Sequence, residues 1–142
     1  MSAKESEARK KDIQGRAFSF ACRIVKLYQF LARKGEPART LGRQVLRAGT
    51  SIGANLEEAS AGQSKADFIS KCSVALKEAR ETHYWLRLLT GAEVVSPHRL
   101  TDLTTEADEL VAILTAIVKK SRSAPRSHHL SSCEVLILNS KF

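Results

Sequence analysis

Apolar side chains recur at alternating steps of three and four residues in four successive stretches of the chain. That spacing places them on one face of an α-helix, because a helix turns by about 100° per residue. In the first stretch, over residues 12–34, this face is formed by Ile13, Ala17, Phe20, Ile24, Leu27 and Leu31. A chain of 142 residues is long enough to enclose one core. The pattern therefore predicts an all-α fold.

Turn and capping residues separate the four stretches. Gly35 and Pro37 end the first, Gly62 ends the second, and Ser64 with Asp67 resembles a capping box that opens the third. Ser96 and Pro97 open the fourth as N-cap and first-turn residues. The predicted helices span residues 12–34, 38–61, 64–90 and 97–122, and the third is expected to bury Phe68, Val74, Ala75, Trp85, Leu86 and Leu89.

Turns this short join antiparallel neighbours, so we predict an antiparallel up-and-down four-helix bundle over residues 12–122. A basic N-terminal arm at residues 1–11 precedes it. Residues 123–142 are expected to form a flexible C-terminal tail, although the apolar run at residues 133–139 is also compatible with a short strand or a docking segment.

Polar side chains lie beside the apolar faces of the second and third helices, where they are expected to be partly buried. Glu78 lies near the middle of the third apolar face, and a buried carboxylate needs a basic partner or hydrogen-bond donors. Arg47 and Asn55 are the candidates. We predict a structural polar network that fixes helix register, with a recognition or self-association patch as the alternative; its members are Gln44, Arg47, Ser51, Asn55, Glu58, Glu78 and Glu81.

Basic residues are concentrated near the start of the chain. The net charge is +8, from 23 Lys plus Arg against 15 Asp plus Glu, and most of the excess falls within residues 1–35. Such a surface suits a polyanion, because Arg and Lys on a rigid helix bind phosphates without reading sequence. The alternatives are a solubilising surface, or arginines that pair with Glu57, Glu58 and Glu81. The candidate nucleic-acid-binding residues are Arg9, Lys10, Lys11, Arg16, Arg23, Lys26, Arg33 and Lys34.

Motifs for catalysis, cofactors or metals are missing from the sequence. The Glu-x-x-His pairs of di-iron bundles do not occur, nor does a phosphate-binding glycine loop or a nucleophile motif. Cys22, Cys72 and Cys133 are too far apart for a zinc site or a disulfide framework. No apolar run approaches the ~20 residues that span a bilayer. We therefore expect a cytoplasmic protein that is not an enzyme, holds no metal or cofactor, and does not enter a membrane.

A set of residues in the second and third helices resembles the bacterial four helix bundle protein family, first named for proteins encoded in intervening sequences of 23S ribosomal RNA genes. Gly53 and Ala59 stand where relatives often have Pro and Gly. The residues that carry the resemblance are Gln44, Arg47, Ser51, Ile52, Ala54, Asn55 and Glu58, then Ser64, Asp67 and Phe68, then Ala75, Glu78, Glu81, Trp85 and Leu86.

The resemblance implies a protomer that assembles into a ring, as a homopentamer with a basic surface. A related bundle is the accessory variability determinant of diversity-generating retroelements, which partners a reverse transcriptase; the match to it rests on residues 85–89 and on Pro97 and His98. The favoured hypothesis is a ring-forming protein that binds nucleic acid or assists a nucleic-acid enzyme. The alternative is a protein-interaction scaffold that does not bind nucleic acid.

Overall fold

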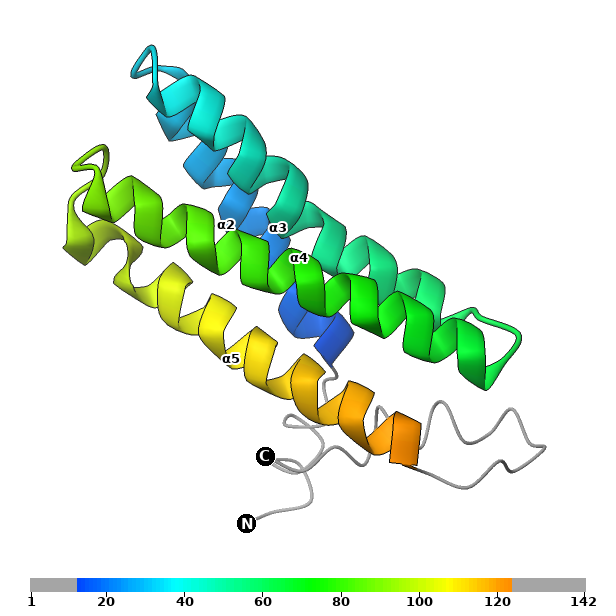
Figure 1. Cartoon of the computed structure of the whole chain (residues 1–142). Coiled ribbons are helices and arrows are strands. Elements are labelled where there is room, and N and C mark those ends of the chain that lie inside the picture. Colours follow the sequence, from blue (N-terminus) through cyan, green and yellow to red (C-terminus); the bar gives the residue numbers. More distant parts are fainter. Residues whose placement is uncertain (1–12, 124–142) are drawn as a thin grey trace, which may run out of the picture.

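The structure is a computed structural model that describes residues 13–123. Four helices follow one another in this range, α2 (Ile13–Ala32), α3 (Ala38–Ser60), α4 (Lys65–Gly91) and α5 (Pro97–Ser123), and no strand occurs among them. They run alternately up and down in one bundle (Figure 1). The predicted all-α four-helix bundle is confirmed. The N-terminal arm at residues 1–11 and the tail from residue 124 lie outside the described residues.

The core forms where the apolar faces of the four helices meet. All six residues of the predicted α2 face are buried, from Ala17, Ile24 and Leu31 at 0% exposure to Leu27 at 8%. Burial of each large apolar side chain stabilises the fold by about 1.5–3 kcal/mol relative to exposure. No buried side-chain nitrogen or oxygen in residues 13–123 lacks a hydrogen-bond partner. The bundle therefore has the interior expected of a well-packed globular domain.

The prediction for α4 was wrong at Val74, which is 38% exposed on the outer side of the helix. Cys72, Ala79 and Thr82 face the core instead, and the buried Thr82 hydroxyl donates to the carbonyl oxygen of Glu78 at 2.7 Å. This bond satisfies the hydroxyl within its own helix, so a polar residue occupies a core position without a partner from another helix.

The ends of the helices follow the local sequence. Helix α2 ends at Ala32, two residues before its predicted end, because the amides of Arg33 and Lys34 donate to the carbonyls of Phe30 and Leu31 in a tighter turn. At the start of α4, the Ser64 hydroxyl accepts a hydrogen bond from the Asp67 amide at 3.1 Å, as the capping pattern predicts.

Helices adjacent in sequence pack closely, whereas α2 and α5, the first and last, pack less closely against each other. Glycines in α3 permit the close contact with α2. A Cβ atom at Gly49 would lie 2.8 Å from Cγ1 and 2.9 Å from Cγ2 of Ile24. At Gly53 it would lie 3.7 Å from Ala17, an ordinary van der Waals distance. Only the first position therefore requires glycine for steric reasons.

The substitution Gly49→Ala should lower the free energy of unfolding by about 1–3 kcal/mol, because a methyl group there forces Ile24 to move. Gly53→Ala is the matched control in the same helix. It should be neutral or stabilising by up to about 1 kcal/mol, since alanine favours the helix. Urea denaturation measures both. Equal effects of the two substitutions would contradict the role of Gly49 in close packing.

Candidate nucleic-acid interface

Arg16, the first described candidate cation of α2, is held by carboxylates of α5. Its Nε and Nη2 atoms donate to the two carboxylate oxygens of Glu106 at 3.0 and 2.9 Å, and Nη2 also donates to Glu109. The hydrogen bond to Glu106 is the main cause that raises the pKa of Arg16. A paired guanidinium is a poor phosphate ligand, so the structure places Arg16 in the α2–α5 contact rather than among the free cations.

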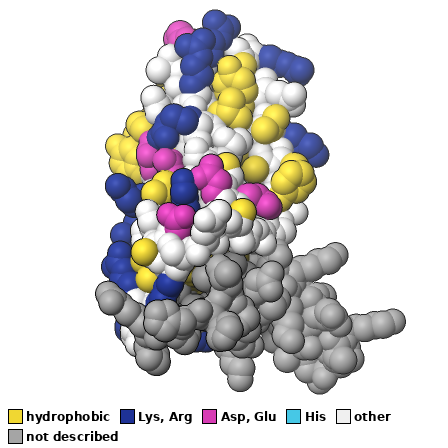
Figure 2. Space-filling view, turned by 90° about the vertical axis from the view of Figure 1, so that its right-hand side faces the viewer, with side chains coloured by type: hydrophobic (Ala, Val, Ile, Leu, Met, Phe, Trp, Pro, Cys, Tyr) yellow, Lys and Arg dark blue, Asp and Glu magenta, His cyan; other side chains and the backbone are white. Residues whose placement is uncertain are grey.

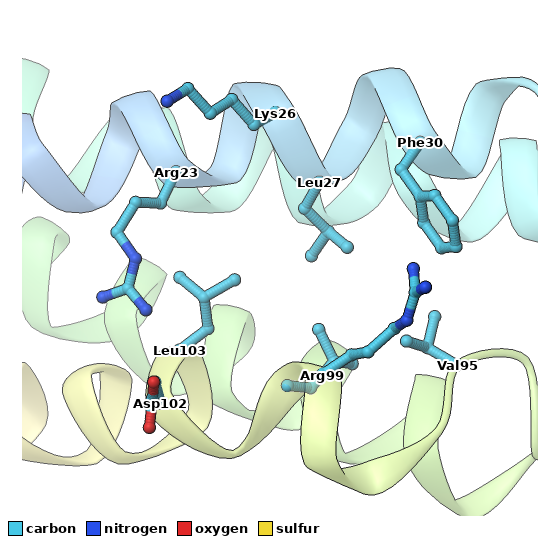
Figure 3. A pocket seen from close by; sticks show the side chains of 9 residues that line it. Arg23, Lys26, Leu27, Phe30, Val95, Arg99, Asp102 and Leu103 are labelled. Atoms are coloured by element: carbon cyan, nitrogen blue, oxygen red, sulfur yellow. The ribbon is translucent and has the colours of Figure 1, made fainter.

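Arg23 and Lys26 lie about two turns further along α2, at the edge that faces α5. They line an open groove between α2 and α5 of about 400 Å³, together with Arg99 and Asp102 of α5. Figure 3 shows Arg23 extending toward α5, while Lys26 turns away from it. Neither cation forms an ion pair with another described residue. Both are exposed and available to an anionic ligand.

Arg33 and Lys34 follow directly after α2 and are exposed as well. The Lys34 ammonium donates to the carbonyl oxygen of Val94 at 2.9 Å and lies 5.1 Å from the centre of the Phe30 ring. Basic side chains dominate the upper end of the face in Figure 2, at the height of the α2–α3 turn in Figure 1. The structure thus brings four of the predicted cations to one part of α2 and its end. Arg9, Lys10 and Lys11 lie outside the described residues.

A second basic surface on α4 escaped the sequence prediction. Lys77, Arg80, Tyr84 and Arg87 are all exposed and follow one another at steps of three, four and three. That spacing places them within one sector of the helix surface. None of the three cations forms an ion pair with another described residue. The same periodicity that located the apolar faces would have located this surface.

The predicted polar network is centred on Arg47, which reaches from α3 to two carboxylates of α4. Its Nη1 atom donates to both oxygens of Glu78 at 3.3 Å, and Nη2 donates to Glu81. Glu81 also accepts a hydrogen bond from the Trp85 indole at 3.1 Å. The bond from Arg47 is the largest cause that lowers the pKa of Glu81, followed by the bond from Trp85. Glu78 therefore has the basic partner that its position requires.

The other members of the predicted network do not join this cluster. The Ser51 hydroxyl donates to the carbonyl of Arg47 at 2.6 Å, and the Asn55 amide donates to the carbonyl of Ser51 at 2.8 Å, so both bond within α3. Glu58 pairs separately with Lys71 of α4. Gln44 is half-buried and takes no part in these contacts. Two separate ion-pair clusters therefore connect α3 and α4 in place of one continuous network.

Residues 13–123 contain no group of three or more His, Cys, Asp or Glu side chains placed to hold a metal ion. Among the four described helices, none combines the length and the apolar character needed to cross a bilayer. Cys22 is exposed, Cys72 is buried, and neither forms a disulfide.

The fold and this surface define a basic four-helix bundle in which five carboxylates pair with cations across contacts between helices. The chain belongs to the 23S rRNA-intervening sequence protein family, whose model matches residues 9–116. It is similar to a solved protein of unknown function from the S23 ribosomal protein family of Bacteroides thetaiotaomicron VPI-5482. The two are 42% identical with a TM-score of 0.70, over 75% of this chain and 98% of the other. Comparison of this chain with curated proteins found no match. The family resemblance drawn from the sequence is confirmed.

Glu81→Gln should lower the free energy of unfolding at pH 7 by less than about 1 kcal/mol, since the pair with Arg47 is partly exposed to solvent. The pKa of Glu81 is lower in the folded state, so its stabilisation is present above the unfolded pKa of about 4.3 and is lost as the pH falls through the folded value. The difference between wild type and variant should therefore shrink toward zero in acid.

Urea denaturation at pH 7 and at about pH 3 measures this loss. Glu57→Gln is the control, because Glu57 is an exposed carboxylate of α3 that forms no ion pair with another described residue. A Glu81→Gln effect that is the same at both pH values would show that the carboxylate charge does not stabilise the α3–α4 contact.

Proposed function

We propose that this protein binds nucleic acid without catalysing a reaction, and that it does so as a homo-oligomer. The observation that carries the proposal is the group of cations at the α2–α5 groove and the end of α2, where Arg23, Lys26 and Arg33 form no ion pair with another described residue. Cations on rigid helices bind the phosphate backbone and release its counterions. Assembly would repeat this group around a ring and multiply its affinity.

An accessory role beside a nucleic-acid enzyme, such as a reverse transcriptase, is part of the same proposal. It is supported by the resemblance to the retroelement accessory protein, which depends on residues 85–89 and on Pro97 and His98. Two of the residues concerned, Arg87 and His98, are exposed. A bundle that holds nucleic acid on one surface could present it to an enzyme bound elsewhere.

The double variant Arg23→Ala, Lys26→Ala should weaken binding to a fluorescent 20-nucleotide RNA and reduce its salt dependence. Each lost phosphate contact removes about 0.7 from the slope of log K against log salt for a single strand, so two contacts remove about 1.4. Fluorescence anisotropy between about 50 and 200 mM salt gives the slope. Lys119→Ala, Arg122→Ala is the matched control, which removes the same charge at exposed positions in the last turns of α5, away from the groove.

Three outcomes would count against this surface. Absence of binding by the wild type at about 50 mM salt would overturn nucleic-acid binding itself, because phosphate contacts are strong there. Equal slopes for the two double variants would show that only net charge matters. Loss of binding in the double variant Lys77→Ala, Arg87→Ala, with normal binding in Arg23→Ala, Lys26→Ala, would show that the nucleic-acid interface lies on α4.

A protein-interaction scaffold is the second candidate function, and exposed apolar residues on α2 favour it. Phe18 is 69% exposed and Val25 is 40% exposed, and they are two helical turns apart on one side of the helix. Exposed apolar side chains that share a helix face are typical of a surface that another protein covers. In an oligomer this side of α2 is the best candidate for the contact between copies.

Phe18→Asp should dissociate the oligomer, since it places a charge in the proposed apolar contact. Light scattering on the wild type should give about five times the 15.6 kDa mass of one chain if the predicted homopentamer forms. Tyr84→Asp is the control, as Tyr84 is a 53% exposed aromatic residue on α4. A monomeric wild type, or an assembly unaffected by Phe18→Asp, would contradict the role of this surface.

A further inference from the structure

We infer that the groove between α2 and α5 is a binding site for an unpaired nucleotide of a single strand. The inference rests on the proposed nucleic-acid binding and specifies its ligand. At about 400 Å³ the groove falls within the size range of small-ligand sites. It exists because α2 and α5 pack less closely than the sequential helix pairs. Arg16 with Glu106 and Glu109 holds the two helices together toward the other end of α2.

The lining of the groove combines an apolar floor with a cationic rim. Its floor is formed by buried leucine and valine side chains, Leu27, Val95, Leu100 and Leu103. Arg23, Lys26 and Arg99 provide three cations at the rim, against the single carboxylate of Asp102. This combination fits a ligand that carries both an anionic group and a flat ring whose face can lie against apolar side chains. A nucleotide has both, in its phosphate and its base.

Phe30 provides the surface on which a base can stack. The guanidinium carbon of Arg99 lies 5.1 Å from the centre of the Phe30 ring, and the Lys34 ammonium lies at the same distance. Figure 3 shows Arg99 rising from α5 toward the ring, with Leu27 beside them. Bases stack on aromatic rings and also on guanidinium planes. The Phe30 ring and the Arg99 guanidinium that lies over it therefore form one aromatic and cationic cluster, against which a base can stack next to phosphate-binding cations.

The geometry favours a single strand over a duplex. Bases in a duplex are stacked and paired inside the helix, so they cannot enter a groove of this size without being unpaired. A duplex could use only the cations at the rim. An acidic peptide could use those same cations, but it has no group that requires the Phe30 ring. Dependence on both the base and the ring is therefore the property that identifies the ligand.

The test compares a 20-nucleotide single strand with an abasic strand of the same length, which has the same phosphates and no bases. The wild type should bind the base-bearing strand at least about fivefold more tightly, the minimum expected for one stacked base. Phe30→Leu should bring the two affinities together while it leaves the salt dependence unchanged. Phe30→Tyr, which keeps an aromatic ring, should restore the difference. Circular dichroism and thermal melting establish that each variant is folded.

Tyr84→Leu is the matched control, because Tyr84 is an exposed aromatic residue among the cations Lys77, Arg80 and Arg87 on α4. It should leave the preference for bases intact. The inference is overturned if the wild type binds both strands equally, or if Tyr84→Leu rather than Phe30→Leu removes the preference. It is also overturned if a poly-glutamate of equal charge binds as tightly as the base-bearing strand. If neither strand binds, the proposed function is overturned instead.

Discussion

Burial of four apolar faces in one core is the constraint on which the remaining features of this bundle depend. Each helix buries the apolar face whose residues recur at steps of three and four. Its polar residues are therefore restricted to the outer surface and to the edges between neighbouring helices. At the edges, charged side chains of neighbouring helices lie within reach of one another, both half-buried ones such as Glu78 and exposed ones such as Glu58. This explains why the ion pairs involving Arg16, Arg47 and Lys71 all connect different helices.

The contacts between helices are stabilised by different interactions. Because Gly49 has no side chain, α2 and α3 approach closely and the Ile24 side chain packs against the Gly49 backbone. Between α3 and α4, Arg47 connects to Glu78 and Glu81. The α2–α5 contact is the looser one, and the bond from Arg16 to Glu106 leaves the opposite end open as a groove. The candidate site is therefore a consequence of uneven packing, since the first and last helices are joined by no turn of their own.

The sequence predicted features that arise within a single helix, such as its buried face. It was less informative about which residues of two different helices come into contact. Periodicity gave the α2 core face correctly, and the need of Glu78 for a base pointed to Arg47. It placed Val74 on the wrong side because the stripe of α4 includes a threonine and small residues that weaken its apolar signal. The pairing of Arg16 with Glu106 depends on which edges of α2 and α5 face each other, which no pattern within one helix reveals.

The Phe30 groove was missed for the same reason. Aromatic residues are few in this chain, and no sequence pattern connects Phe30 with Arg99, which lies on another helix. Only their proximity in the fold, 5.1 Å from guanidinium carbon to ring centre, brings them into one site. The second basic surface, on α4, is a different case. Lys77, Arg80 and Arg87 belong to one helix, so their spacing in the sequence was sufficient to predict that they share one side of it.

The ion pairs also account for where the basic character of the surface lies. Within residues 13–123, the cations Arg16, Arg47 and Lys71 together hold five carboxylates, those of Glu58, Glu78, Glu81, Glu106 and Glu109. These contacts use more acids than bases and place the acids at helix edges, so the remaining surface is richer in cations than the composition suggests. Since exposed charges act over about 8–10 Å at moderate salt, a phosphate near Arg23 or Lys77 interacts mainly with the local cations. A modest overall charge of +8 is thereby concentrated into surfaces that a polyanion can use.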